Sequence, residues 1–295
     1  MKTILVLTDF SAGANHAAQY ALHLAQKIKA NLLLCNVFLV PSNDGMAAQV
    51  AWPMESYEIL KGNSENDINK LARRLNKQLD NENETRQFRP CIEQSSASGI
   101  LTEVLNEIVN RHEILLAVIG THNAGRLSTF FIGNHAQNII DQATCPVLII
   151  PGNASFKGYK KMAFATDMAP NDINVLHSLS GLAKYLNSEI LITHVFKNRT
   201  SGKESIRADV FLKMISSKIN YPGIFYREIK SENVVTSLDW LSEHIDIDLL
   251  VLIHRKRNFF QKIFERSIAQ KLAGHFNKAM LIFPFINQPC ALPVF

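Results

Sequence analysis

The amino-acid sequence contains two copies of one pattern. Residues 4–9 (ILVLTD) and 32–38 (LLLCNVF) return 158 positions later as residues 162–167 (MAFATD) and 190–196 (ILITHVF). Further along, the second copy's counterparts of the first copy's segments lie only 133 positions later: 116–119 with 249–252, and 147–150 with 280–283. Constant offsets between segments that lie far apart indicate a duplicated folding unit.

The duplication predicts two domains. A chain of 295 residues exceeds the usual size of one domain. The join reads PGNAS at residues 151–155, a short linker composition, so we expect domains at 1–152 and 153–295. The fall in offset means that about 25 residues are missing from the middle of the second copy. The first copy's extra length falls around residues 41–61 and is expected to be a loop and helix insertion.

Each copy alternates short apolar runs with amphipathic stretches, which is typical of parallel strands that are buried on both faces and joined by helices. The pattern predicts an α/β fold with two tandem doubly wound parallel sheets of the Rossmann-like kind. Ser11 is an expected N-cap for the first helix. Asn171 or Asp172 is expected to cap its counterpart.

Composition excludes several classes of protein. The net charge of +5 favours anionic ligands without requiring nucleic acid, which is not an expected partner. The four cysteines form no CxxC pair, so neither a zinc site nor a disulfide framework is expected. The histidines have no metal-ligand spacing, and no nucleophile or paired-carboxylate signature is present. Without a signal-peptide pattern or an apolar run near the roughly 20 residues that span a bilayer, we expect a cytoplasmic protein with no membrane partner.

Ligands of open parallel sheets bind beyond the carboxyl ends of the strands, which directs attention to Asp9, Val37 and residues 120–134. The segment 120–134 (GTHNAGRLSTFFIGN), followed by 143–150 (ATCPVLII), resembles the end of a universal stress protein domain. The resemblance covers nearly the whole chain, twice. It implies a fold like that of the adenine nucleotide alpha hydrolases.

Family members that bind ATP carry a glycine, two residues, a second glycine, nine residues, and a third glycine followed by Ser or Thr. Gly120 and Gly133 match the first and third glycines, whereas Asn123 and Asn134 stand at the second glycine and at the hydroxyl position. Glycine lets backbone N–H groups approach phosphate oxygens, and asparagine tolerates left-handed backbone and can donate through its amide.

By the same resemblance, Asp9 faces the ribose or phosphate end of the nucleotide, and the Val37 backbone meets the adenine edge. The implied ligand is ATP or another adenine nucleotide, with or without Mg²⁺. The residues also permit a simpler interpretation, in which Asp9 is a turn residue that caps the next helix and the glycines form a tight connection between strand and helix.

The second copy departs further from the motif. Ile253 and Lys256 stand at the first two glycine positions, and Arg266 and Ser267 stand at the third glycine and hydroxyl position. We therefore expect no ATP there. The basic loop at residues 254–257 (HRKR) is expected to be a solvated loop, with an anion contact or a nucleic-acid contact as alternatives.

These observations predict a stress-responsive regulatory protein that binds an adenine nucleotide in domain 1 and is not an enzyme, although slow ATP hydrolysis, for which no base is named, stays open. The second domain is expected to act as a pseudo-symmetric partner. Because domains of the family commonly dimerise through their last strands, the resemblance implies that residues 147–150 pair with 280–283 in an intramolecular pseudo-dimer, and two chains can still associate as a homodimer. The alternative is a nucleotide-independent interaction protein in which both sites have degenerated.

Overall fold

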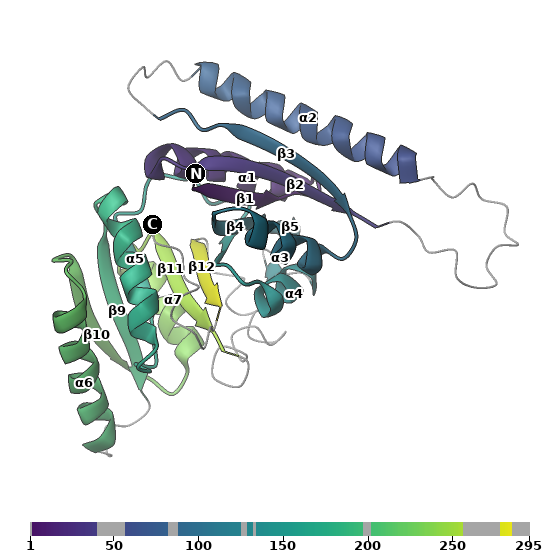
Figure 1. The fold of residues 1–295 in the computed structure, drawn as a ribbon. Helices are drawn as coiled ribbons and strands as arrows, with labels where there is room; N and C mark the ends of the chain where they lie inside the picture. Colours follow the sequence, from purple (N-terminus) through teal and green to yellow (C-terminus); the bar gives the residue numbers. More distant parts are fainter. Residues whose placement is uncertain are drawn as a thin grey trace, which may run out of the picture.

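A computed structural model describes residues 2–39, 57–81, 88–124, 129–131, 134–196, 202–255 and 278–284. Strands of both copies join one 10-stranded sheet in the order β10-β9-β8-β11-β12-β7-β4-β1-β2-β3 (Figure 1). We call the part from β1 to β7 the first half and the part from β8 to β12 the second half. The sheet is parallel within each half, so the predicted α/β fold is confirmed.

The elements of the first half alternate between strand and helix. They are β1 (Thr3–Leu7), α1 (Ala12–Ile28), β2 (Asn31–Phe38), α2 (Tyr57–Asn81), β3 (Ile92–Ser98), α3 (Leu101–Arg111), β4 (Ile114–Gly120), the hairpin of β5 (His122–Ala124) and β6 (Thr129–Phe131), α4 (Asn134–Gln142) and β7 (Val147–Ile150). The second half repeats this order: β8 (Lys161–Ala165), α5 (Asp172–Leu186), β9 (Glu189–Phe196), α6 (Gly202–Lys218), β10 (Ile224–Lys230), α7 (Val234–His244), β11 (Leu249–His254) and β12 (Ala279–Pro284).

The strand registers confirm the duplication residue by residue. Ile4 pairs with Leu116 between β1 and β4, and their counterparts Met162 and Leu249 pair between β8 and β11. The backbone repeats as well. Phe10 has a φ of 62°, and the residue 158 positions later, Met168, has a φ of 58°. The two offsets found in the sequence therefore identify equivalent positions in three dimensions.

The two halves meet at β7 and β12, which pair antiparallel. The sequence predicted this pairing of 147–150 with 280–283. The linker between the halves is also packed. The Nε2 atom of His16 on α1 lies 2.5 Å from the Ala154 carbonyl oxygen, and the ring of Tyr20 meets that of Phe156 edge-on and that of Tyr159 at a tilt. The halves are thus joined through both the sheet and the linker.

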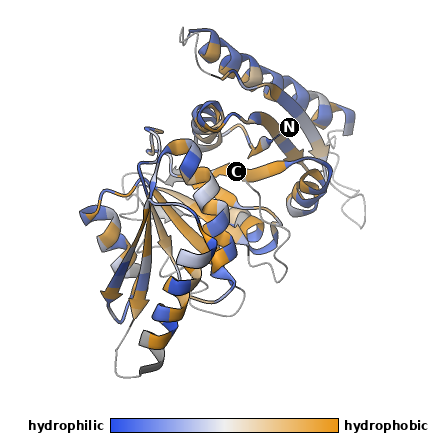
Figure 2. Ribbon diagram, turned by 60° about the vertical axis from the view of Figure 1, so that its left-hand side comes forward, coloured by the Kyte–Doolittle hydropathy of each residue, from blue (hydrophilic) through white to orange (hydrophobic). Residues whose placement is uncertain are grey.

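Alternate residues of each central strand enter two cores, one on each face of the sheet. Ile4 and Val6 belong to the core that includes residues of α1, α2, α5 and α6, whereas Leu5 and Leu7 belong to the core that includes residues of α3, α4 and α7. In Figure 2 the central strands are largely hydrophobic and the helices show both colours, as expected of a sheet covered on both faces. The predicted N-cap is present: Ser11 Oγ accepts a hydrogen bond from Ala14 N at 3.2 Å.

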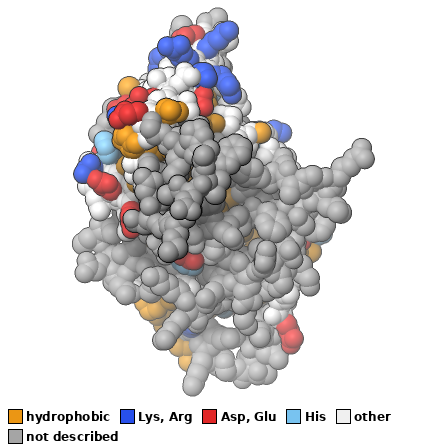
Figure 3. Space-filling view, turned by 90° about the vertical axis from the view of Figure 1, so that its right-hand side faces the viewer, with side chains coloured by type: hydrophobic (Ala, Val, Ile, Leu, Met, Phe, Trp, Pro, Cys, Tyr) orange, Lys and Arg blue, Asp and Glu red, His pale blue; other side chains and the backbone are white. Residues whose placement is uncertain are grey.

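Part of the first copy's extra length lies in a helix, since α2 has 25 residues and α6 has 17. The segment in which the insertion was expected, 41–61, lies mostly outside the described residues, and α2 begins at Tyr57. In Figure 3, Lys and Arg side chains gather at the top of the molecule, where α2 lies in Figure 1. None of the helices in the described ranges is long and apolar enough to cross a bilayer.

Candidate functional site

The topology places a switch point in each half. In the first half, β2 and β3 lie on one side of β1 and β4 lies on the other, so the carboxyl ends of β1 and β4 flank the first switch point. Asp9 follows β1 and Gly120 ends β4, so the fold brings these two predicted site residues to one edge of the sheet. The second switch point lies between the ends of β8 and β11.

The turn after β1 is fixed by its own side chains. Phe10 N donates to Thr8 Oγ1 at 3.0 Å, and Ser11 N donates to Asp9 Oδ1 at 3.0 Å. Phe10 takes the left-handed conformation that reverses the chain into α1. Asp9 therefore has the turn role that the sequence offered as an alternative, and it is an exposed residue at the switch point.

The reason for glycine at position 120 is a close approach between two backbones. A Cβ atom built on Gly120 would lie 2.2 Å from the carbonyl oxygen of Gly13, far inside contact distance. The missing side chain lets the N-terminus of α1 reach the end of β4. The first turn of α1 itself contains no acidic residue, so no carboxylate within the helix competes for the positive end of its dipole.

A buried polar network connects the residue after β1 with β2, α2 and β3. Asn36 Nδ2 donates to the carbonyl oxygen of Thr8 at 2.7 Å, and Ser64 Oγ on α2 donates to Asn36 Oδ1 at 2.7 Å. Ser64 also lies 2.7 Å from Ser96 Oγ on β3. The next residue, Val37, is half-buried on β2. Sequence analysis did not predict this network, because its members lie in four separate segments.

The remaining predicted residues are only partly described. Asn123 lies in the middle of β5, opposite Phe130 of β6, and Asn134 is the first residue of α4. The conformations of their side chains, and Gly133 altogether, lie outside what the structure describes. Within the described part of the chain, no group of three or more His, Cys, Asp or Glu residues could hold a metal ion.

The second switch point has the same backbone frame. Met168 N donates to Thr166 Oγ1 at 2.8 Å, as Phe10 does to Thr8. The Nδ1 atom of His194 lies 2.9 Å from the Thr166 carbonyl oxygen, where Asn36 bonds Thr8 in the first half. The two halves thus differ at this edge through side chains placed on a shared frame.

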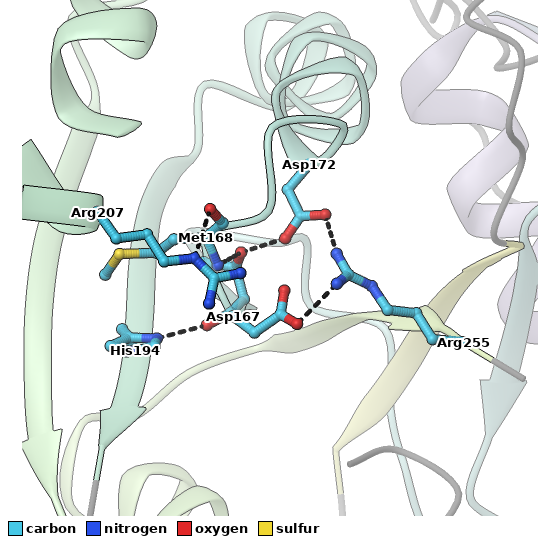
Figure 4. Close-up of polar contacts among 7 residues, drawn as sticks. Asp167, Met168, Asp172, His194, Arg207 and Arg255 are labelled. Atoms are coloured by element: carbon cyan, nitrogen blue, oxygen red, sulfur yellow. Dashed lines mark hydrogen bonds and ion pairs between the residues drawn. The ribbon is translucent and has the colours of Figure 1, made fainter. Parts of the chain in front are cut away.

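The side chain that distinguishes the second half is Arg255, which follows β11. Its Nη1 donates to Asp167 Oδ2 at 2.6 Å and its Nη2 donates to Asp172 Oδ1 (Figure 4). Thr166 Oγ1 donates to the other oxygen of Asp172 at 2.5 Å. The Arg255 side chain is 11% exposed and that of Asp172 only 1%. A largely buried guanidinium thus bridges two carboxylates.

Burial raises the pKa of Asp172 to about 6, although the Thr166 hydrogen bond and the positive charge of Arg255 both lower it. Asp172 is the first residue of α5, and Asn171 makes no capping hydrogen bond through its side chain. Asn171 therefore takes one of the two predicted N-cap positions without a capping hydrogen bond from its side chain, and the Asp172 carboxylate is engaged with Thr166 and Arg255.

The expectation of a solvated basic loop was wrong for its first two residues. His254 is buried at the end of β11, and its Nε2 lies 3.0 Å from Asp141 Oδ1 on α4 of the first half. Arg255 is ion-paired as described above. Lys256 and Arg257 lie outside the described residues. The available signal was Asp172, a carboxylate standing where the first copy has the buried Ala14.

Comparisons with known proteins agree with this architecture. Residues 1–151 match the Universal stress protein family. Universal stress protein MJ0531 of Methanocaldococcus jannaschii is 26% identical over 149 residues, which cover 50% of this chain and 81% of that protein. A universal stress protein from Archaeoglobus fulgidus has a similar structure, with a TM-score of 0.65 and 13% identity over 96% of this chain and 98% of that one.

A putative universal stress protein from Pseudomonas aeruginosa gives a TM-score of 0.57 at 13% identity, over 96% of this chain and 92% of that one. A universal stress protein solved in complex with cAMP is 21% identical over 50% of this chain and 96% of that one, with a TM-score of 0.36. The two structures that match nearly the whole chain share its fold. Since the family match spans residues 1–151 of 295, the chain belongs to the universal stress protein family.

Proposed function

We propose that this stress-response protein has a regulatory role and binds ATP or another adenine nucleotide at the first switch point, while the second half serves as a pseudo-symmetric partner. The proposal includes the division into domains 1–152 and 153–295, a cytoplasmic location and the capacity of two chains to associate. Binding shifts conformation and no turnover is assigned to the chain, since no base or nucleophile was identified at the site.

One observation supports this proposal above the others, namely the contrast between equivalent positions in the two halves. Where the second half has Asp172 and Arg255, the first half has Ala14 and His122. Neither the buried carboxylate nor the guanidinium has a counterpart at these first-half positions. An anion at the N-terminus of α1 would therefore meet the helix dipole without a competing carboxylate from the helix's first turn.

The residues that would hold the nucleotide are those that the family resemblance implies. Asp9 would serve the ribose or phosphate end, Val37 the adenine edge, and the backbone at Gly120 and Gly133 the phosphates, with Asn123 and Asn134 in place of the usual glycine and hydroxyl. Exposure of Asp9 after β1 fits a role toward a ligand or its Mg²⁺.

The second candidate function, a nucleotide-independent interaction protein, is favoured by the contact at Gly120. The space beside that glycine is taken by the backbone of Gly13. Packing alone therefore explains one of the two surviving motif glycines. This explanation of Gly120 requires no bound nucleotide.

Thermal unfolding with and without nucleotide distinguishes the two functions. A ligand that binds only the native state stabilises it, by about 2.7 kcal/mol when its concentration is 100 times its Kd. We expect a higher melting temperature with Mg-ATP, ADP, AMP or cAMP at millimolar concentration. Gly133→Val should abolish the shift. The equivalent carboxylates provide a matched pair: Asp9→Asn should weaken the shift, whereas Asp167→Asn in the second half should leave it intact. No shift with any of the four nucleotides would favour the interaction protein.

A further inference from the structure

At the second switch point, charged side chains lie at the N-terminus of α5. A nucleotide-binding half would offer open space and a helix dipole at this place. Asp172 places a carboxylate at the first residue of α5, the place where a helix attracts an external anion. Arg255 then forms ion pairs with this carboxylate and with that of Asp167. Both the anionic and the cationic partner thus come from the chain itself.

We propose that Arg255 is an internal ligand of the second switch point: its guanidinium occupies a site built for that group. The two carboxylates and the Thr166 hydroxyl form a receptor that is complementary to a guanidinium and repels phosphate. The inference does not depend on nucleotide binding in the first half.

The geometry favours a guanidinium over other cations. The two terminal nitrogens of Arg255 contact different carboxylates, Nη1 with Asp167 and Nη2 with Asp172. A planar fork with several fixed donors suits such a bridge, whereas an ammonium is a point charge on a flexible stem. The second oxygen of Asp172 is already satisfied by Thr166. Three of the four oxygens of the two carboxylates are thereby hydrogen-bonded, and only Asp167 Oδ1 is not.

The position of Arg255 is fixed by its neighbours in the chain. The preceding strand β11 pairs with β8 on one side and β12 on the other. His254, the last residue of this strand, lies 3.0 Å from Asp141 on α4 of the first half. The backbone that carries Arg255 is therefore anchored in both halves, and removal of the guanidinium alone should leave the receptor standing.

Chemical rescue tests the proposal. In Arg255→Ala the receptor loses its guanidinium, and the melting temperature should fall. Added guanidinium chloride at about 20 mM, far below the molar concentrations that unfold proteins, should enter the site and raise the melting temperature of this variant by about 2 to 5 °C. Equal concentrations of NaCl and of urea, a neutral molecule of the same shape, should give no such rise.

Matched variants show whether the response belongs to this site. Arg227→Ala removes an exposed arginine from β10 and should respond to guanidinium no more than the unaltered protein does. Asp172→Ala combined with Arg255→Ala removes half of the receptor and should abolish the rescue. A fall in melting temperature without selective rescue, or rescue that survives in this double variant, would overturn the proposal.

Arg255→Lys keeps the test decisive if Arg255→Ala does not fold. It retains one positive charge but cannot bridge two carboxylates with a planar fork. Its melting temperature should lie several degrees below that of the unaltered protein. A melting temperature equal to that of the unaltered protein would show that any cation suffices and would contradict a site built for guanidinium.

Discussion

Leu148 of β7 lies opposite Leu281 of β12 in the antiparallel pair that joins the two halves. These leucines are the same position in the two copies, 133 residues apart. On either side of them, Val147 faces Ile282 and Ile149 faces Met280. Exchanging the two copies converts one of these pairs into the other. The halves are therefore related by a pseudo-two-fold axis through the leucine pair, the self-complementary arrangement of a symmetric dimer, here formed within one chain.

Substitutions at this axis should have matching effects. Leu281→Ala and Leu148→Ala each remove a side chain that is 1% exposed, and each should lower the free energy of unfolding by about 2 to 5 kcal/mol. Urea unfolding measures both. Leu39→Ala, at a residue that is 70% exposed, is the control and should change stability by less than about 0.5 kcal/mol. A large effect at only one of the two leucines would argue against a symmetric contribution.

The glycine at the end of β4 should not tolerate even a methyl group. In Gly120→Ala the new Cβ would clash with the backbone of Gly13, so α1 or β4 must move, which should cost about 1 to 3 kcal/mol. Gly62→Ala on α2 is the matched control because a Cβ there meets nothing within 4 Å. That variant should instead gain about 0.5 to 1 kcal/mol, since alanine favours a helix interior. Equilibrium unfolding of the two variants checks both signs, and a stable Gly120→Ala would refute the close approach.

Asp172 should make stability depend on pH in a defined window. Its pKa in the folded protein is about 6, above the ordinary value of 3.8, chiefly because the carboxyl is buried. The folded state therefore binds more protons than the unfolded state between these values. The stability contributed by this group is present below about pH 4 and is lost as the pH rises through 6.

The measurement is the free energy of unfolding between pH 4 and 7 for the unaltered protein and for Asp172→Asn, which does not titrate. The difference between the two proteins should change with pH only in this window. Because Arg255 lowers the pKa of Asp172, Arg255→Ala should move the window to higher pH. Parallel curves for the unaltered protein and Asp172→Asn would show that Asp172 titrates normally.

Sequence reasoning succeeded where the signal is repeated or local. The shared offset identified the segments of Leu148 and Leu281 as equivalent, and the family resemblance predicted that these segments would pair. Ser11 caps its helix as its type and place indicated. It failed at Arg255, whose partners lie 83 and 88 residues earlier in the chain. A basic loop residue is usually solvated, and only the comparison of Asp172 with Ala14 could have suggested a buried partner.

Exchange of the residues that distinguish the two switch points tests whether they decide which half binds a ligand. Ala14→Asp with His122→Arg gives the first half the residues that form the ion pair of the second, and should abolish the nucleotide-dependent rise in melting temperature that we propose. The charges are introduced together, because an unpaired buried carboxylate would destabilise the fold by several kcal/mol.

The reverse exchange, Asp172→Ala with Arg255→His, removes both internal partners from the second half. It should leave the first half's nucleotide response unchanged, since Ala14 and His122 are untouched. It should gain no second nucleotide site, because Ile253 still stands where the first half has Gly120. Calorimetric titration counts the bound nucleotides per chain. Binding is assigned to the first half if the unaltered protein binds one nucleotide per chain, the first exchange binds none and the reverse exchange binds one. Retention of nucleotide after the first exchange would show that the residues at 14 and 122 do not control access.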